Sequence, residues 1–389
     1  MSKTSILKSN PKACPLASKC GGCKLQNMTY ERQLEYKQGK VISLLGRFGR
    51  VETIIGMDEP YRYRNKVQAA FTATKSGKII SGVYQSGSRS VVSTDKCMLE
   101  DEIADRIIVD IRKMLPRFKM TVYDEESGRG LIRHVLVRRG FLSGEVMVVL
   151  VGHNPIFPLK KVFAEELVKK HPEITTIVFN ISTDRLNLVL GSRDEVLYGK
   201  GYIEDTLCGC RFRISPRSFY QVNPKQTEKL YSLAMELAEL DGESTVIDAY
   251  CGIGTIGLVA AKTAKSVVGV ELNADAVRDA KINAELNGSK HARFYKGDAG
   301  DFLEEQAKEG KAADVLFMDP PRAGSTKKFI DAIGVMKPKK IVYVSCDPET
   351  LARDLGQITK KGYKVGRICP VDMFPHTGHI ECAVSLIQT

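Results

Sequence analysis

Two patterns of hydrophobic and polar positions divide most of the chain. Between residues 61 and 196 apolar positions alternate in short runs, with two stretches of helical spacing among them. The runs predict strands at residues 67–72, 79–84, 132–138, 144–151 and 176–181, and the helical stretches lie at 101–115 and 158–170. Short strands mixed with helices in this way are typical of an α+β domain with a mostly antiparallel sheet.

The flanking parts of the chain follow other patterns. Apolar residues at helical spacing predict one amphipathic helix over residues 30–45. From about residue 215 strands alternate with helices, which is typical of a Rossmann-like α/β fold. We therefore expect an N-terminal segment at residues 1–50, a central α+β domain at 51–210 and a C-terminal α/β domain at 211–389.

Composition narrows the class of protein. The 389-residue chain has no long apolar run, and its first ten residues hold too short an apolar stretch for a signal peptide. We expect a cytoplasmic protein without a membrane segment, whose ten cysteines are thiols or metal ligands rather than disulfides. The net charge of +12 at pH 7 favours a polyanionic partner.

Three of the ten cysteines, Cys14, Cys20 and Cys23, lie within ten residues, and two glycines allow a tight loop between the last two. Cys97 is the candidate for a fourth ligand, because the later cysteines are isolated or belong to other patterns. Four thiolates fit either zinc or a [4Fe–4S] cluster, and the spacing excludes only the CxxxCxxC pattern of radical enzymes. A closed centre would clamp the N-terminus to the segment near residue 97; the alternative is three incidental cysteines.

Basic and aromatic residues interleave at two places in the central domain, residues 61–66 and 130–139. Arginine and lysine neutralise phosphates, while tyrosine and histidine stack on unpaired bases, so both stretches suit single-stranded RNA. Arg133 and Arg138 are the arginines that we expect to contact phosphates. The alternative is that these charges protect edge strands from aggregation.

A glycine-rich turn follows a predicted strand at residues 244–257, and the next strand ends in Glu271. This order resembles a nucleotide-binding fold, in which such an acid contacts the ribose. Asp248, however, lies just ahead of the glycines. A carboxylate there suits the cationic sulfonium and amino group of S-adenosylmethionine better than a pyrophosphate.

Two later strands end in residues that suggest chemistry. One runs into Asp319-Pro-Pro-Arg322, and the other delivers Cys346 to its C-terminal end before Pro348. That edge of an open α/β sheet is where ligands bind, although a lone cysteine there is often a small buried apolar residue. Asp-Pro-Pro also marks enzymes that methylate exocyclic amines of adenine, which carry an aromatic residue where Arg322 stands. Only the C5 reaction on a pyrimidine requires a thiol nucleophile.

That reaction also needs a base. C5 of uracil becomes nucleophilic only after a thiolate adds to C6, and its proton must later be removed so that the thiolate can leave. Glu381, at the head of the last predicted strand, is the best candidate. His376 and His379 could be a pair of metal ligands, but no third ligand follows in suitable spacing.

With these motifs in order, the chain resembles the RNA (uracil-5-)-methyltransferases, most closely the iron–sulfur-containing branch that acts on 23S rRNA. The resemblance implies a class I methyltransferase domain, [4Fe–4S] ligation by the four early cysteines, a Cys346 nucleophile and a Glu381 base. The motifs that carry it are Cys14/Cys20/Cys23/Cys97, Phe219-Tyr-Gln221-Val-Asn, Asp248-Ala-Tyr-Cys-Gly, Asp319-Pro-Pro-Arg, Ser345-Cys346-Asp-Pro and His379-Ile-Glu381. The residues that it implies for S-adenosylmethionine are Gln221, Tyr250, Glu271 and Asp319.

One departure affects the expected substrate. Many relatives begin with an RNA-gripping β-barrel of the TRAM type, and Cys14 comes too early here to leave room for it. We therefore expect the central domain and the cysteine segment of a monomer to hold RNA, and no DNA. Transfer RNA uridine 54 is the alternative target. A non-catalytic iron–sulfur RNA-binding protein is disfavoured because the motifs for nucleophile, base and cofactor are intact.

Overall fold

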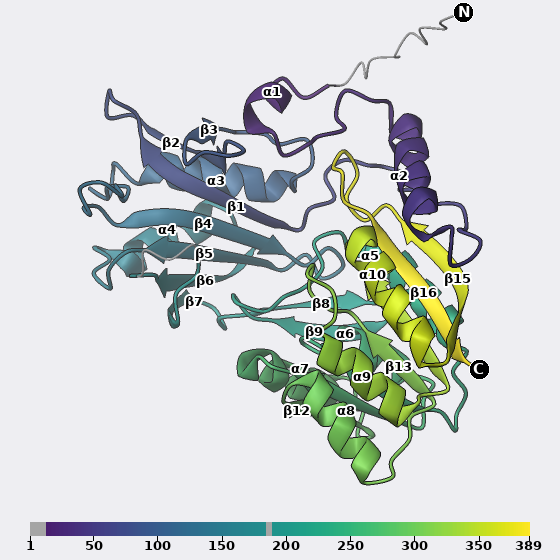
Figure 1. The fold of residues 1–389 in the computed structure, drawn as a ribbon. Helices are drawn as coiled ribbons and strands as arrows, with labels where there is room; N and C mark the ends of the chain where they lie inside the picture. Colours follow the sequence, from purple (N-terminus) through teal and green to yellow (C-terminus); the bar gives the residue numbers. More distant parts are fainter. Residues whose placement is uncertain (1–12, 184–188) are drawn as a thin grey trace, which may run out of the picture.

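The computed structural model describes residues 13–183 and 189–389 (Figure 1). The first ten residues, on which the prediction about a signal peptide rests, lie outside this range. Two seven-stranded sheets and a two-stranded hairpin organise the described chain. None of its described helices has the length and apolar character that would let it cross a membrane.

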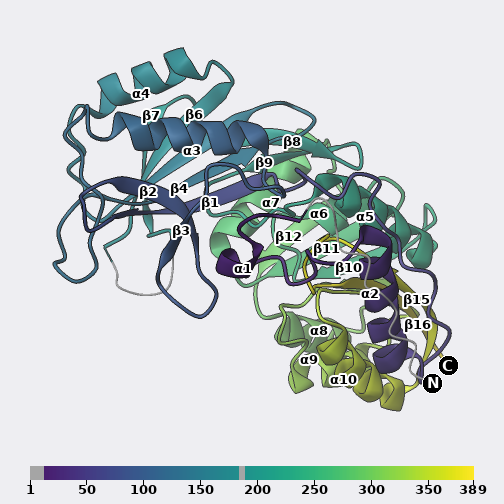
Figure 2. The same ribbon diagram turned by 90° about the horizontal axis from the view of Figure 1, so that it is seen from above.

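The N-terminal segment contains a short helix and a long one. These are α1 (Ala17–Cys20) and α2 (Tyr30–Leu45), the second matching the predicted bounds. Figures 1 and 2 both show α2 beside the C-terminal part of the chain rather than over the central sheet. Val41 and Leu45 of α2 are fully buried in the apolar cluster of that C-terminal part.

The central sheet has the strand order β3-β2-β1-β4-β5-β6-β7, and every pairing except the parallel β5–β6 is antiparallel. Helices α3 (Glu102–Met114) and α4 (Lys160–Lys170) cover one face. Residues of the opposite face, among them Leu136 and Val149, pack in one cluster with the C-terminal domain. The strands are β1 (Lys66–Ala73), β2 (Ile79–Tyr84), β3 (Val91–Ser93), β4 (Ile132–Arg139), β5 (Val146–Gly152), β6 (Ile174–Ile181) and β7 (Arg193–Tyr198).

The C-terminal sheet has the order β12-β11-β10-β13-β14-β16-β15. Its first five strands are parallel and β16 is antiparallel to both neighbours, which confirms the Rossmann-like prediction. The strands are β10 (Thr245–Ala249), β11 (Ser266–Glu271), β12 (Ala292–Lys296), β13 (Val315–Met318), β14 (Lys340–Ser345), β15 (Tyr363–Val371) and β16 (Glu381–Gln388).

Helices cover both faces of this sheet because its central strands are apolar on both sides. In β14, Val342 packs with α5, α6 and α7, whereas Tyr343 packs with α8, α9, α10 and α2. The hairpin of β8 (Ile203–Leu207) and β9 (Cys210–Ile214) precedes these elements. The helices are α5 (Pro224–Ala238), α6 (Thr255–Ala260), α7 (Ala274–Leu286), α8 (Ala299–Lys308), α9 (Lys327–Met336), α10 (Pro348–Ile358) and the 3-10 turn η1 (Thr359–Lys361). The division at residues 50 and 210 stays a prediction.

Candidate active site

The thiol and the carboxylate that were predicted to act together lie at the ends of two paired strands. β14 and β16 are antiparallel, and the register pairs Ser345 with Cys382. One step further in the same register, Cys346 and Glu381 occupy opposite positions. Opposite residues of an antiparallel pair project to the same face, so both groups face one site. Cys346 is half-buried and Glu381 is 3% exposed.

The turn after β14 fixes the position of Cys346. Ser345 Oγ donates to the Asp347 carbonyl at 3.1 Å and accepts from the Asp347 amide at 3.3 Å. The Asp347 carboxylate then caps α10 by accepting from the Glu349 and Thr350 amides. Pro348 starts that helix, where a missing amide proton costs nothing. Cys346 is therefore held between a strand end and a capped helix.

Charges around the pair set its acidity. Burial, Glu381 and Asp319 raise the pKa of the Cys346 thiol to about 11, and Arg322 acts in the opposite direction. Burial and Asp319 raise the pKa of Glu381 to about 8, which Arg322 again opposes. Asp319 keeps some exposed surface, yet its surroundings are crowded enough that burial raises its pKa to about 7. A raised pKa makes Glu381 a stronger base, and Arg322 is the cation that favours the thiolate.

The glycine-rich turn after β10 forms a second part of the site. Gly252 and Gly254 have φ of 54° and 84°, which only glycine adopts freely. The Gly252 amide donates to Glu271 Oε2 at 3.2 Å, and the Gly257 amide donates to Asp248 Oδ2 at 2.7 Å. Asp248 Oδ1 is buried and has no hydrogen-bond partner among the described residues. Burial, Asp319 and Glu271 raise the pKa of Asp248 to about 8.

A cavity of about 340 Å³ opens beside this turn, lined by Gly252, Glu271 and Phe219 among others. Phe219 is 69% exposed, an unusual state for a phenylalanine two residues before the buried Gln221. Its exposure gives the cavity an aromatic wall. The carbonyl of Gln221 accepts a hydrogen bond from Asn65 Nδ2 at 3.1 Å, which ties this wall to the central domain.

Tyr250 lies on the other side of the turn. Its backbone has φ of 64°, and its ring centre is 5.1 Å from that of Phe329. Burial raises the pKa of its hydroxyl to about 12. The structure thus brings Tyr250, Glu271 and Asp319 to the carboxyl ends of neighbouring strands β10, β11 and β13, where ligands of open α/β sheets bind.

The four early cysteines gather without forming ligand geometry. The charges of Cys20 and Cys14 act on Cys23, whose pKa burial raises to about 11, and Cys23 acts on Cys97. Even so, no group of three or more His, Cys, Asp or Glu side chains within residues 13–183 and 189–389 is arranged to hold a metal ion. The predicted cluster is therefore not confirmed.

His376 and His379 belong to the loop before Glu381. The His376 ring stacks on Tyr61 with centres 4.6 Å apart, and its Nδ1 lies 3.1 Å from Gln33 Nε2. Burial lowers the pKa of His376 to about 4, so the ring is neutral at pH 7. These contacts give His376 a structural role in this loop.

The prediction that Arg133 and Arg138 contact phosphates is wrong for the side chains as they lie. Arg133 is 9% exposed and binds Glu125 at 2.9 Å, and Arg138 is 1% exposed and donates to the Ser218 carbonyl at 2.9 Å. The alternating pattern of β4 did not reveal the burial of Arg138, because the C-terminal domain rather than water covers that face of the strand. Arg133 is instead covered within the central domain, where it contacts Glu125 and Ser182.

Sequence reasoning also missed a buried network behind the site. Lys37 and Asp372 form an ion pair there, and the Tyr30 hydroxyl donates to Asp372 Oδ2 at 2.8 Å. No local signal could reveal the pair, because its members are 335 residues apart.

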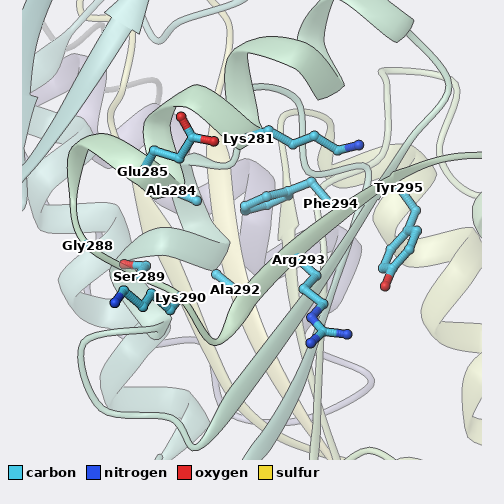
Figure 3. Close-up of a pocket in the computed structure, with 10 residues that line it drawn as sticks. All are labelled: Lys281, Ala284, Glu285, Gly288, Ser289, Lys290, Ala292, Arg293, Phe294 and Tyr295. Atoms are coloured by element: carbon cyan, nitrogen blue, oxygen red, sulfur yellow. The ribbon is translucent and has the colours of Figure 1, made fainter.

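Figure 3 shows a separate cavity of about 610 Å³ between α7 and β12. Lys281, Lys290 and Arg293 line it, together with the edge of Phe294. None of the predicted site residues contributes to this cavity. It lies on the outer edge of the C-terminal sheet, where β12 is the last strand.

Known proteins resemble the chain over nearly its whole length. The family model described as tRNA (Uracil-5-)-methyltransferase matches residues 29–389. An uncharacterized RNA methyltransferase of Bacillus cereus is 43% identical over 95% of this chain and 82% of its own. Another uncharacterized RNA methyltransferase, from Halalkalibacterium halodurans, is 45% identical over 96% of this chain and 82% of its own.

A solved structure agrees with these matches. The crystal structure of Pyrococcus abyssi tRNA (uracil-54, C5)-methyltransferase in complex with S-adenosyl-L-homocysteine has a TM-score of 0.78 to this chain. It is 28% identical and covers 95% of this chain and 86% of its own. The strand order, the paired Cys346 and Glu381 positions and these matches agree, and the chain belongs to the tRNA (uracil-5-)-methyltransferase family.

Proposed function

We propose that the protein transfers a methyl group from S-adenosylmethionine to C5 of a uridine in 23S rRNA. The observation that carries the proposal is the opposite placement of Cys346 and Glu381 at the ends of β14 and β16. A thiol and a base on one face are the two groups that methylation of a uracil C5 demands. Membership of the family supports the same chemistry.

The steps follow from the two side chains. The Cys346 thiolate adds to C6 of the uracil, and the electron pair of the C5–C6 double bond moves so that C5 becomes a nucleophile. When bound, S-adenosylmethionine would supply the electrophilic methyl group for C5, and S-adenosylhomocysteine would leave with the electron pair of the broken S–CH3 bond. Glu381 then accepts the proton from C5, the C5–C6 double bond re-forms, and the Cys346 thiolate leaves. Arg322 assists by favouring the ionised thiol.

The residues around the glycine-rich turn fit S-adenosylmethionine. Asp248, Glu271 and Asp319 place negative charge near one another, and Asp248 Oδ1 lacks a partner among the described residues. Carboxylates without a counter-ion suit a ligand that carries a sulfonium and an ammonium group. We assign Gln221, Tyr250, Glu271 and Asp319 to the cofactor. The solved relative from Pyrococcus abyssi holds the demethylated product of the same cofactor.

Cys14, Cys20, Cys23 and Cys97 are proposed as ligands of a [4Fe–4S] cluster. The support is their proximity: the charge of one thiol acts on the next, although the apolar neighbours Met57 and Tyr63 now pack against Cys23 and Cys97. A bound cluster would ionise the thiols, whose pKa values burial raises. It would tie the N-terminal segment to the start of α3.

The second candidate function is the same reaction on uridine 54 of transfer RNA. The observation in its favour is the likeness to the Pyrococcus abyssi enzyme, whose substrate is transfer RNA. Ribosomal RNA is preferred because the cysteine motif resembles that of the iron–sulfur branch acting on 23S rRNA.

One experiment tests the proposal and separates the two substrates. Purified protein is incubated with radiolabelled S-adenosylmethionine and with either unmodified 23S rRNA or unmodified transfer RNA, and 5-methyluridine is mapped by mass spectrometry. We expect label in 23S rRNA and none with Cys346→Ala. Methylation of transfer RNA alone would replace the preferred substrate with the second candidate. Absence of 5-methyluridine from both RNAs would refute the function.

A further inference from the structure

Two cations lie opposite each other where the central sheet meets the C-terminal domain. Lys66 on β1 pairs with Arg138 on β4 in the antiparallel register. Their side chains therefore project to the same face of the sheet, at the end where β1 begins. Arg64 is close enough for its charge to act on Lys66. The sheet thus presents a local concentration of positive charge beside the other domain.

Arg138 is the buried member of this pair. It is 1% exposed, and its Nη1 donates to the Ser218 carbonyl at 2.9 Å. Its Nε and Nη2 atoms are buried and have no hydrogen-bond partner in the described part of the chain. A buried guanidinium is costly unless a carboxylate or another anion compensates it. Here the observed partner is a neutral carbonyl.

Lys66 is half-buried and lacks compensation as well. It forms no ion pair or hydrogen bond through its ammonium group within residues 13–183 and 189–389. Burial, Arg138 and Arg64 all lower its pKa, to about 8. Arg64 is better compensated, because its charge also acts on the half-buried Glu100. Lys66 and Arg138 are the two cations for which an external anion would lower the electrostatic energy.

Lys66 and Arg138 lie close to the candidate active site. Asn65, next to Lys66, donates from Nδ2 to the Gln221 carbonyl at 3.1 Å and from its backbone to the Val222 carbonyl at 2.9 Å. Arg138 holds Ser218 of the same segment. The segment between these contacts carries the exposed Phe219, which lines the cavity beside the glycine-rich turn. An anion at Lys66 would therefore lie beside the wall of the active site.

We propose that Lys66 binds a backbone phosphate of the RNA next to the uridine that is methylated. Arg138 is the positioning residue beneath it, which supplies positive potential and fixes the Ser218 carbonyl. The inference rests on the proposed function, because it assumes an RNA substrate. A phosphodiester fits better than a free anion, because the polymer brings its charges to the site together with the target base.

The test compares Lys66→Gln, Lys66→Arg and the control Lys75→Gln, which removes an exposed lysine just beyond the end of β1. RNA affinity is measured by fluorescence polarisation over a range of salt concentrations, with the fragment that the wild type methylates. We expect Lys66→Gln to weaken binding about tenfold and to reduce the log–log salt slope by about 0.7. Lys66→Arg should restore both values, and Lys75→Gln should change neither.

The affinity of Lys66→Gln for S-adenosylmethionine, measured by calorimetry, shows whether Lys66 binds an RNA phosphate or the carboxylate of the cofactor. An unchanged affinity supports the RNA contact, whereas a loss of cofactor binding with an unaltered salt slope overturns it. A wild-type protein that methylates RNA while Lys66→Gln keeps the full slope refutes this inference alone. A wild type that methylates no RNA refutes the proposed function instead.

A second measurement places the change in the RNA and compares wild type with Lys66→Gln. RNA fragments carry one uncharged methylphosphonate at each position around the target uridine in turn. We expect a single position to reduce wild-type affinity about tenfold, and the same substitution to have no further effect on Lys66→Gln. Equal tolerance at every position would show that no phosphate is bound in a defined place.

Discussion

Lys37 and Asp372 form an ion pair in which neither side chain is exposed to solvent, with Nζ and Oδ1 2.5 Å apart. Lys37 lies on α2, and Asp372 directly follows β15. Lys37 also donates to the Phe374 carbonyl at 3.1 Å, and the Tyr30 hydroxyl donates to the second oxygen of Asp372. These contacts hold the start of the loop that leads to Glu381, so the N-terminal helix supports the position of Glu381.

Breaking this pair should destabilise the protein. Lys37→Met leaves the carboxylate of Asp372 buried without its counter-ion, and we expect the free energy of unfolding to fall by about 3–5 kcal/mol in urea titrations. The double variant Lys37→Met/Asp372→Leu removes both charges and should recover most of that loss. If Lys37→Met were as stable as the wild type, the pair would contribute nothing to the fold.

The roles proposed for Cys346 and Glu381 predict different outcomes when each residue is replaced. Cys346→Ala cannot form an adduct and should show neither methylation nor covalent RNA. Glu381→Gln can still add and methylate, but it cannot remove the C5 proton. We expect it to accumulate enzyme joined to C6 of an already methylated uracil, seen on denaturing gels as a band shifted by the mass of the RNA.

The band should depend on S-adenosylmethionine and be absent from the double variant Cys346→Ala/Glu381→Gln. Normal turnover by Glu381→Gln, without a trapped species, would show that another group or water removes the proton.

The elements that the sequence revealed are those whose pattern is local. Residues 30–45 and 79–84 have the bounds predicted from spacing alone, because one apolar face is enough to identify each element. The sequence pattern after the glycine-rich turn also predicts a helix over residues 255–264, but α6 ends earlier, at Ala260. Ala261 and Ala264 continue the buried apolar face beyond the end of this helix, so the hydrophobic pattern alone gave no signal for its end.

What the sequence could not show depends on pairing between distant segments. The opposite placement of Cys346 and Glu381 follows from the β14–β16 register, which no spacing encodes. The strand pattern predicts an exposed side chain for Arg138, yet the C-terminal domain covers that face of the sheet and buries Arg138. Motifs therefore named the candidate site residues, whose roles stay predictions, but they did not reveal the electrostatic surroundings of these residues.

Arg322 should control the pH dependence of the reaction. Its charge lowers the pKa values of Cys346 and Glu381, which stand at about 11 and about 8. The proposed roles require both groups in their ionised forms, so kcat/KM should rise with pH up to about 11, and most steeply below about pH 8. Arg322→Ala should move this rise to higher pH and reduce activity about tenfold at pH 7, since one pKa unit is a factor of ten.

Arg322→Lys should keep the wild-type profile, and Arg293→Ala, an exposed arginine in the cavity of Figure 3, is the matched control. A loss with Arg322→Ala that is equal at every pH would assign Arg322 to RNA binding rather than to acidity.

The resemblance to the iron–sulfur branch predicts that the four cysteines bind an iron–sulfur cluster rather than zinc. Protein purified without oxygen should be brown, with iron and sulfide in equal amounts, and Cys97→Ser should lose most of both. Cys208→Ser, which removes a thiol at the turn between β8 and β9, is the control and should keep the colour. Colourless protein with one zinc per chain would refute the cluster, and unchanged metal in Cys97→Ser would refute the fourth ligand.

Lys66 allows a test in which stability and function move in opposite directions. Its pKa is about 8 in the folded protein and about 10.4 in an unfolded chain. Between these values the unfolded state binds more protons, so the contribution of Lys66 to stability rises with pH. Below pH 8 the lysine is charged in both states, and the full cost of holding it near Arg138 and Arg64 is present.

Removing the charge should therefore stabilise the protein at neutral pH. We expect Lys66→Met to raise the melting temperature at pH 7 by on the order of 2 °C, with a gain that shrinks as the pH approaches 10.5. The same variant should bind RNA more weakly, because the phosphate loses its cation. Lys75→Met should change neither property. If Lys66 served only in packing, Lys66→Met would instead be less stable than the wild type at pH 7. That result would contradict the inference that the uncompensated charge of Lys66 binds an anion.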